Sequence, residues 1–241
     1  MPDTRKHRGP HPADRRLFEP KTWPILRAAV ADLSWLLSRG YSDVAALKLV
    51  GDRYRLTERQ RKAVMRSSCS DAALADRAAK QVAPERLQKQ TVLVDGFNVL
   101  TTIEAALADG IVLVGRDGCY RDLASMHGSY RKVEETPPAI TLIGEVLAEL
   151  QVAEVVWYLD RPVSNSGRLS VLIRELSQQH GWAWTVELVD NPDPVLAAAQ
   201  DVVASADSVV LDRCRAWFSL AREVVRRRIP SVHLQTDSHS E

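Results

Sequence analysis

The chain has 241 residues, of which 45% are hydrophobic and 26% are charged, with 12 Pro and 11 Gly. This composition excludes a disordered, collagen-like or disulfide-rich chain and predicts a globular protein with a sizeable core. The net charge of +1 hides an asymmetry. Residues 1–90 hold 19 Lys and Arg against 10 Asp and Glu, a net charge of +9, whereas residues 91–241 hold 13 against 21, a net charge of −8. A basic segment joined to an acidic one favours a nucleic-acid partner.

The three cysteines Cys69, Cys119 and Cys214 are far apart in the sequence and form no Cys-x-x-Cys pair. This spacing excludes a disulfide framework and a structural zinc site. No apolar run approaches the roughly 18 residues that a membrane span needs, and the first residues are polar. We therefore expect a cytoplasmic protein with no membrane partner, while the oligomeric state stays unknown.

The first part of the chain has the period of helices. Apolar residues recur every three or four positions over residues 22–39, and shorter helices fit residues 43–50 and 57–66. Thr57 followed by Gln60 predicts a capping box at the start of the third helix. We expect a flexible basic head over residues 1–20 and a small helical N-terminal domain over residues 21–88.

Cations concentrate on the third helix and its approach. A short helix, a turn and a basic helix outline a helix-turn-helix, and a basic patch also binds phosphates without reading bases. The structural alternative is that these cations solvate the outer face of a helical bundle, and the sequence leaves both open. The candidate nucleic-acid patch comprises Arg53, Arg55, Arg59, Arg61, Lys62 and Arg66.

After residue 90 the hydrophobic period changes. Short apolar, β-branched runs occupy residues 91–94, 155–159, 184–189, 202–204 and 231–234, and helical stretches lie between them at residues 97–107, 139–150, 167–180 and 194–200. Apolar strands that alternate with helices are typical of a parallel sheet covered on both faces. We predict a doubly wound, mainly parallel α/β domain over residues 89–235, followed by a flexible tail over residues 236–241.

Three of the predicted strands deliver an aspartate to their C-terminal ends: Asp95, Asp160 and Asp207. In an open parallel sheet these ends meet at one crevice, where such folds bind ligands. Several carboxylates at one place need a cation between them, and Mg²⁺ or Mn²⁺ is the natural choice for oxygen ligands. The structural alternative for each residue is a helix cap or a turn. Asn98 could orient Asp95 or a metal-bound water, or bond its own turn.

The stretch Val94-Asp95-Gly96-Phe97-Asn98-Val99-Leu100 resembles the opening strand and turn of PIN-like and NYN-type nucleases. Ser205-Ala206-Asp207-Ser208 resembles their later turn, and Asp160 falls where they carry a middle acid. The resemblance covers residues 91–235 and implies a PIN-like fold and a metal-dependent nuclease. Those nucleases often carry a further acid, for which the sequence offers Asp212 or one of Glu104, Glu134 and Glu135.

The whole chain also resembles an uncharacterised prokaryotic family, domain of unknown function 434. The resemblance rests on the helical head over residues 33–50 and on the segment Asp160-Arg161-Pro162-Val163-Ser164-Asn165-Ser166-Gly167. It implies relatives without implying a function.

Two segments could bind a substrate beside the carboxylates. The start of the predicted helix at residue 167 offers free N–H groups for a phosphate, or is merely a capped surface loop. The aperiodic stretch 115–132 mixes Tyr, Arg and His127, which suits unpaired bases, or is a hairpin insertion whose tyrosines pack on the sheet. The candidate substrate-binding residues are Arg161, Ser164, Ser166, Arg168, Ser208, Arg116 and Arg121.

These features predict a metal-dependent ribonuclease or related phosphodiesterase, with single-stranded RNA as partner and Mg²⁺ or Mn²⁺ as cofactor. Asp95, Asp160 and Asp207 would hold the ion, with Asp212 or Glu135 as a further ligand, and the ion would activate water. One alternative is a non-catalytic nucleic-acid-binding or adaptor protein on an inactive PIN-like scaffold. Another is a phosphatase or nucleotide hydrolase on a different doubly wound sheet, although no Gly-x-x-x-x-Gly-Lys-Ser/Thr loop is present.

Overall fold

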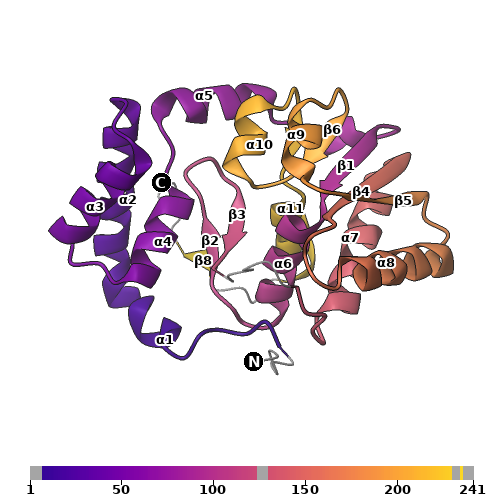
Figure 1. Cartoon of the computed structure of the whole chain (residues 1–241), viewed down its shortest axis with the longest axis horizontal. Coiled ribbons are helices and arrows are strands. Elements are labelled where there is room, and N and C mark those ends of the chain that lie inside the picture. Colours follow the sequence, from indigo (N-terminus) through magenta and orange to yellow (C-terminus); the bar gives the residue numbers. More distant parts are fainter. Residues whose placement is uncertain (1–6, 124–129, 230–233, 236–241) are drawn as a thin grey trace.

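The computed structural model describes residues 7–123, 130–229 and 234–235. It shows a mixed α/β protein with a helical N-terminal region and a five-stranded parallel sheet (Figure 1). A small second sheet lies between the two parts. Within the described residues, no helix is long and apolar enough to cross a membrane.

Three helices of the helical region begin with residues suited to the N-cap position. Ser42, Thr57 and Ser70 accept hydrogen bonds from the first-turn N–H groups of their helices, and the capping box predicted for Thr57 and Gln60 is confirmed. The elements are α1 (Asp14–Leu17), η1 (Pro20–Thr22), α2 (Trp23–Ser38), α3 (Asp43–Arg53), α4 (Glu58–Ser67), α5 (Asp71–Lys80) and η2 (Pro84–Leu87).

The basic head, expected to be flexible over residues 1–20, has many contacts from residue 7 onward. Arg8 donates to the buried Glu104, and Asp14 of α1 accepts from Arg59 of α4. His7 lies 2.7 Å from a carboxylate oxygen of Glu135. Ion pairs of this kind therefore hold residues 7–20 against both parts of the protein. The tail predicted over residues 236–241 lies outside the described residues.

The main sheet has the strand order β5-β4-β1-β6-β7, and all its neighbours are parallel. The first strand of this sheet in sequence lies at its centre. The next two strands in sequence lie on one side of it, and the last two lie on the other side. The strands are β1 (Thr91–Asp95), β4 (Glu154–Asp160), β5 (Trp184–Val189), β6 (Val202–Ala204) and β7 (Trp217–Phe218).

Helices cover both faces of this sheet, as the apolar pattern predicts. On one face Val92 and Val94 of β1 pack in the largest core, together with residues of four helices: α6 (Gly96–Leu107), α7 (Thr136–Glu149), α8 (Ser166–His180) and α11 (Leu220–Arg228). On the other face Leu93 packs with residues of α9 (Pro192–Ala197) and α10 (Ser208–Arg213). Because alternate residues of a strand point to opposite faces, one strand contributes to both cores.

Within the stretch 115–132, aperiodic in sequence, residues 115–122 form the turn and the second strand of a β-hairpin. Strands β2 (Val112–Val114) and β3 (Tyr120–Asp122) are antiparallel, and β2 also pairs with β8 (Leu234–Gln235). Both Tyr120 and Tyr130 are buried in the main core, as in the structural alternative given for this stretch. His127 lies outside the described residues, as does the strand predicted over 231–234 except for its last residue.

Candidate functional site

The three aspartates predicted from sequence all lie at the C-terminal edge of the main sheet. Asp95 ends β1, Asp160 ends β4, and Asp207 follows β6. Because β1 pairs with β4 on one side and with β6 on the other, Asp95 occupies the centre. This edge includes the point where the order of strand addition reverses, which is the usual ligand position in such sheets.

Asp95 is buried with its side chain among other carboxylates. It is only 7% exposed, and its Oδ2 atom accepts one hydrogen bond, from the Ser205 hydroxyl at 2.7 Å. Burial raises the pKa of Asp95 to about 7, and the charges of Asp207, Asp193 and Asp160 raise it further while Ser205 opposes them. The carboxyl is therefore half protonated near neutral pH when nothing neutralises its surroundings.

Asp193, in the first turn of α9, is a member of this cluster that the sequence prediction missed. Burial, Asp207 and Asp160 all raise the pKa of Asp193, and burial also raises the pKa of Asp160. The signal was present, since β5 is another parallel strand and the first acids after it, Asp190 and Asp193, must emerge at the same edge. We call Asp95, Asp160, Asp193 and Asp207 the aspartate cluster.

The turn over residues 205–207, here called the carboxylate turn, is fixed by side chains. The amide of Ala206 donates to Asn98 Oδ1 at 2.8 Å, and the amide of Asp207 donates to Ser205 Oγ at 3.0 Å. Asn98 thus bonds this turn rather than its own. Asp207 Oδ1 accepts from Val209 N at 2.8 Å, so the capping role given as its alternative is also present.

Gly96 allows the first turn of α6 to approach β4 closely. A Cβ atom at this position would lie 2.5 Å from Leu159 Cδ2 and 2.9 Å from the Tyr158 carbonyl oxygen. The carbonyl belongs to the backbone and cannot rotate away. A residue with a side chain would therefore displace the strand end that carries Asp160 from the one that carries Asp95.

The aspartate cluster has no cationic partner in the part of the chain that the structure describes. Its carboxylate oxygens suit a hard divalent ion such as Mg²⁺ or Mn²⁺, which keeps several waters. Among the described residues, no three His, Cys, Asp or Glu side chains lie close enough to form a complete metal centre. These carboxylates thus have the chemistry of Mg²⁺ or Mn²⁺ ligands, but the described side chains do not form a closed three-ligand centre.

Neither residue considered as a further ligand belongs to the aspartate cluster. Asp212 accepts from Arg77 Nε at 2.7 Å, and Glu135 is bonded to His7. Of the other two acids, Glu104 is fully buried and bonded to Arg8, Tyr130 and Thr136. Glu134 is exposed near His7.

The candidate substrate-binding residues divide into two groups. Arg116 and Arg121 are bonded within the protein, to Asp71 and to Asp117. The others follow β4 or β6 at the edge that carries the aspartate cluster. Of these, Arg168 and Ser208 are exposed. Ser166 is buried and its hydroxyl donates to the Arg161 carbonyl, while the Arg161 side chain pairs with Asp190 at 3.2 Å. The Ser164 carbonyl accepts a hydrogen bond from the Tyr130 amide.

Ion pairs occupy half of the candidate nucleic-acid patch. Arg59 pairs with Asp14, Arg61 with Asp52, and Arg53 with Asp32. Of the remaining cations, Arg55 is exposed. Lys62 is half-buried, and burial and the charge of Arg66 lower its pKa. Arg66 has a buried Nε atom that lacks a hydrogen-bond partner. Much of the positive charge is thus neutralised within the helical region.

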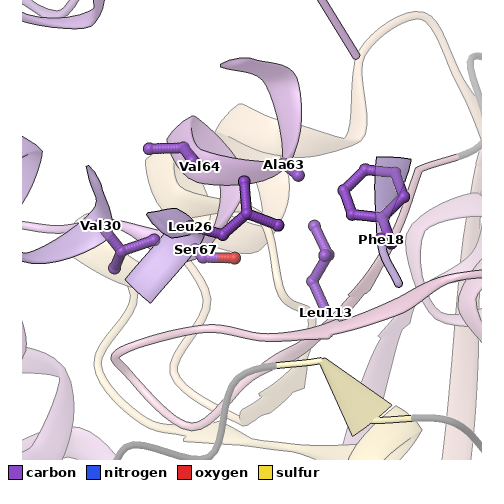
Figure 2. A pocket seen from close by; sticks show the side chains of 7 residues that line it. All are labelled: Phe18, Leu26, Val30, Ala63, Val64, Ser67 and Leu113. Carbon is purple, nitrogen blue, oxygen red and sulfur yellow. The ribbon is translucent and has the colours of Figure 1, made fainter. Parts of the chain in front are cut away.

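A small cavity lies between the helical region and the hairpin (Figure 2). Its volume of about 10 Å³ is room for at most one water. It is therefore too small for a substrate. The lining is apolar except for Ser67, and consists of Phe18, Leu26, Val30, Ala63, Val64, Ser67 and Leu113.

Comparisons with known proteins agree with the helical and α/β parts of the chain. Residues 25–80 match the family described as Protein of unknown function (DUF434), and residues 84–223 match Domain of unknown function (DUF5616). The chain is 32% identical over 186 residues to the uncharacterized protein MJ0935 of Methanocaldococcus jannaschii. The aligned residues make up 77% of this chain and 88% of that protein. No solved structure matches. The chain therefore belongs to the DUF5616 family and carries a DUF434 domain before it.

Proposed function

We propose that this protein is a divalent-cation-dependent phosphodiesterase that acts on single-stranded RNA, with the aspartate cluster as its centre. The observation that supports this proposal is Asp95, a buried carboxylate whose pKa is raised by three other carboxylates and that has no cationic partner among the described residues. A bound Mg²⁺ or Mn²⁺ would lower the pKa of a water and stabilise the negative charge that develops at phosphorus.

The residues of this chain then have separate roles. Asp95 and its neighbours in the aspartate cluster hold the cation, while Ser205 and Asn98 keep the carboxylate turn beside Asp95. Arg168 is exposed and forms no ion pair within the described residues, and no side chain caps the start of α8. Together these groups suit a phosphate, because a free helix start offers N–H donors and the guanidinium adds charge.

The central first strand and the acids at its edge are compatible with the PIN-like fold that the sequence resemblance implies. The rival is an adaptor that binds RNA without cleaving it. Against this rival, carboxylates without a cation repel one another and repel a phosphate. The expected location in the cytoplasm stays a prediction.

The test is cleavage of end-labelled single-stranded RNA with Mn²⁺, with and without EDTA, by wild type and by Asp95→Asn. We expect cleavage that needs Mn²⁺ and that falls at least a hundredfold in the variant. Asp201→Asn is the matched control, because Asp201 is exposed and precedes β6 at the opposite edge of the sheet. Equal cleavage by wild type and Asp95→Asn would refute the mechanism, and binding without cleavage would favour the adaptor.

A further inference from the structure

A chain of buried ion pairs connects helix α5 with the carboxylate turn. Arg121 of β3 is 5% exposed and uses all three of its nitrogens. Its Nη1 and Nη2 atoms donate to the two oxygens of Asp117 at 2.8 and 2.7 Å, and its Nε atom donates to the Ala206 carbonyl at 2.8 Å. Ala206 lies between Ser205, which bonds Asp95, and Asp207.

Arg77 of α5 extends this series of contacts to the C-terminal end of α10. Its Nη1 atom donates to Asp117 Oδ2 at 2.6 Å, and its Nε atom donates to Asp212 Oδ1 at 2.7 Å. Figure 1 shows α5 beside α10. Helix α10 has six residues, with Asp207 as its N-cap and Asp212 in its last turn. So short a helix has little stability of its own, and contacts at its two ends fix its position.

We propose that Arg77, Asp117 and Arg121, which we call the arginine clamp, are positioning residues that set the carboxylate turn against Asp95. Through them, helix α5 of the helical region controls how well the aspartate cluster binds a divalent cation. This inference rests on the proposed function for its effect on cation binding, but not for its effect on the turn. Burying such ion pairs adds little net stability over apolar packing, so a role in geometry accounts for them better.

The test compares lysine substitutions of the buried Arg121 and of the partly buried Arg59. Arg121→Lys keeps the charge but loses the planar fork that reaches Asp117 and Ala206 together. Arg59→Lys is the matched control, because Arg59 makes the same two-nitrogen contact with Asp14, a buried aspartate in the helical region. Mn²⁺ affinity is measured by electron paramagnetic resonance, and amide exchange at Ala206 and Asp207 by NMR.

We expect Arg121→Lys to weaken Mn²⁺ binding about tenfold, as changes behind metal ligands commonly do, and to speed exchange of both amides. Arg59→Lys should change either quantity less than twofold. Mn²⁺ affinity equal to wild type in Arg121→Lys, or an equal loss in both variants, would overturn the proposal. If wild type binds no Mn²⁺, the proposed function fails, and the exchange rates alone decide whether the clamp holds the turn.

Should Arg121→Lys fail to fold, Asp212→Asn serves instead, since the Asp212 side chain is 47% exposed. This variant removes the negative charge that pairs Arg77 with α10 and leaves the pair between Arg77 and Asp117 in place. Faster exchange at Asp207, with Mn²⁺ binding weakened about threefold, would support the clamp. Unchanged exchange and affinity would overturn it.

Discussion

Two buried aspartates of the α/β region have opposite surroundings. Asp117 is 9% exposed and contacts the guanidinium groups of Arg121 and Arg77, whereas Asp95 is 7% exposed and faces carboxylates. Although burial acts in the opposite direction, the two arginines lower the pKa of Asp117, while the pKa of Asp95 is raised to about 7. Nearly equal burial thus yields a structural acid in one place and a candidate ligand in the other. The partners of a buried charge, not its depth, indicate its role.

The largest effect is expected at the paired aspartate. Asp117→Asn leaves the buried Arg121 without its counter-charge and Arg77 with only the half-exposed Asp212, and breaking a buried ion pair costs about 3–5 kcal/mol. The free energy of unfolding, measured in urea at pH 7, should fall by that amount. Asp71→Asn is the control, because it removes the ion pair with Arg116 at an exposed site. The loss of such a pair costs less than about 1 kcal/mol. Equal losses in the two variants would contradict this account of Asp117.

At the unpaired aspartate the same substitution should have the opposite sign. The folded-state pKa of Asp95, about 7, lies above the ordinary value of 3.8 for an aspartate, so wild type loses stability as the pH rises between these values. Asp95→Asn removes that loss and should raise the free energy of unfolding at pH 8 by up to about 4 kcal/mol. The gain should vanish near pH 4. Urea unfolding in EDTA at several pH values measures it, and parallel curves for variant and wild type would rule out a raised pKa.

A divalent cation should make the surroundings of Asp95 more like those of Asp117, because it supplies the positive charge that Asp95 lacks. Mg²⁺ at about a hundred times its Kd should stabilise wild type by about 2.7 kcal/mol. Thermal unfolding with Mg²⁺, compared with NaCl of equal ionic strength, measures the effect. Asp95→Asn should show little of it. Stabilisation of equal size in that variant would place the ion elsewhere.

The smallest effect concerns the one hydrogen bond that Asp95 accepts. Ser205→Ala removes this bond and the acceptor of the Asp207 amide, with a cost of about 1 kcal/mol. Because the Ser205 bond lowers the pKa of Asp95, its loss should raise that pKa further. A carboxyl titration followed by NMR measures the shift. Ser170→Ala, which removes a buried hydroxyl of α8, should leave the titration unchanged.

Much of this architecture could be predicted from local patterns. The apolar runs that end at Asp95 and Asp160 identified two neighbouring strands, and Thr57 with Gln60 marked the start of α4. The strands β2 and β3 were not predicted as strands, because three residues each are too few for a period to appear, although a hairpin insertion was the alternative for residues 115–132. The two-residue strand β7 is below that limit as well.

The partners of the charged residues could not be predicted, since they are distant in sequence. Arg77 and Arg59 appear as free cations in the sequence, yet they bond Asp117 and Asp14, which lie 40 and 45 residues away. Asp193 differs from these cations, because its position after a parallel strand did indicate the edge of the sheet at which it lies. Composition gave the sign of charge in each half of the chain, but the folded structure decides which charges stay available to a ligand.

The contact between Arg8 and Glu104 also bears on how the two parts of the protein can move. Arg8 precedes the helical region and bonds α6, while η2 at the end of that region leads directly into β1. The helical region is therefore tethered to the α/β region at both of its ends. Because Leu113 and Leu123 also pack in the core of the helical region between these ends, the two parts should resist rotation as well as separation.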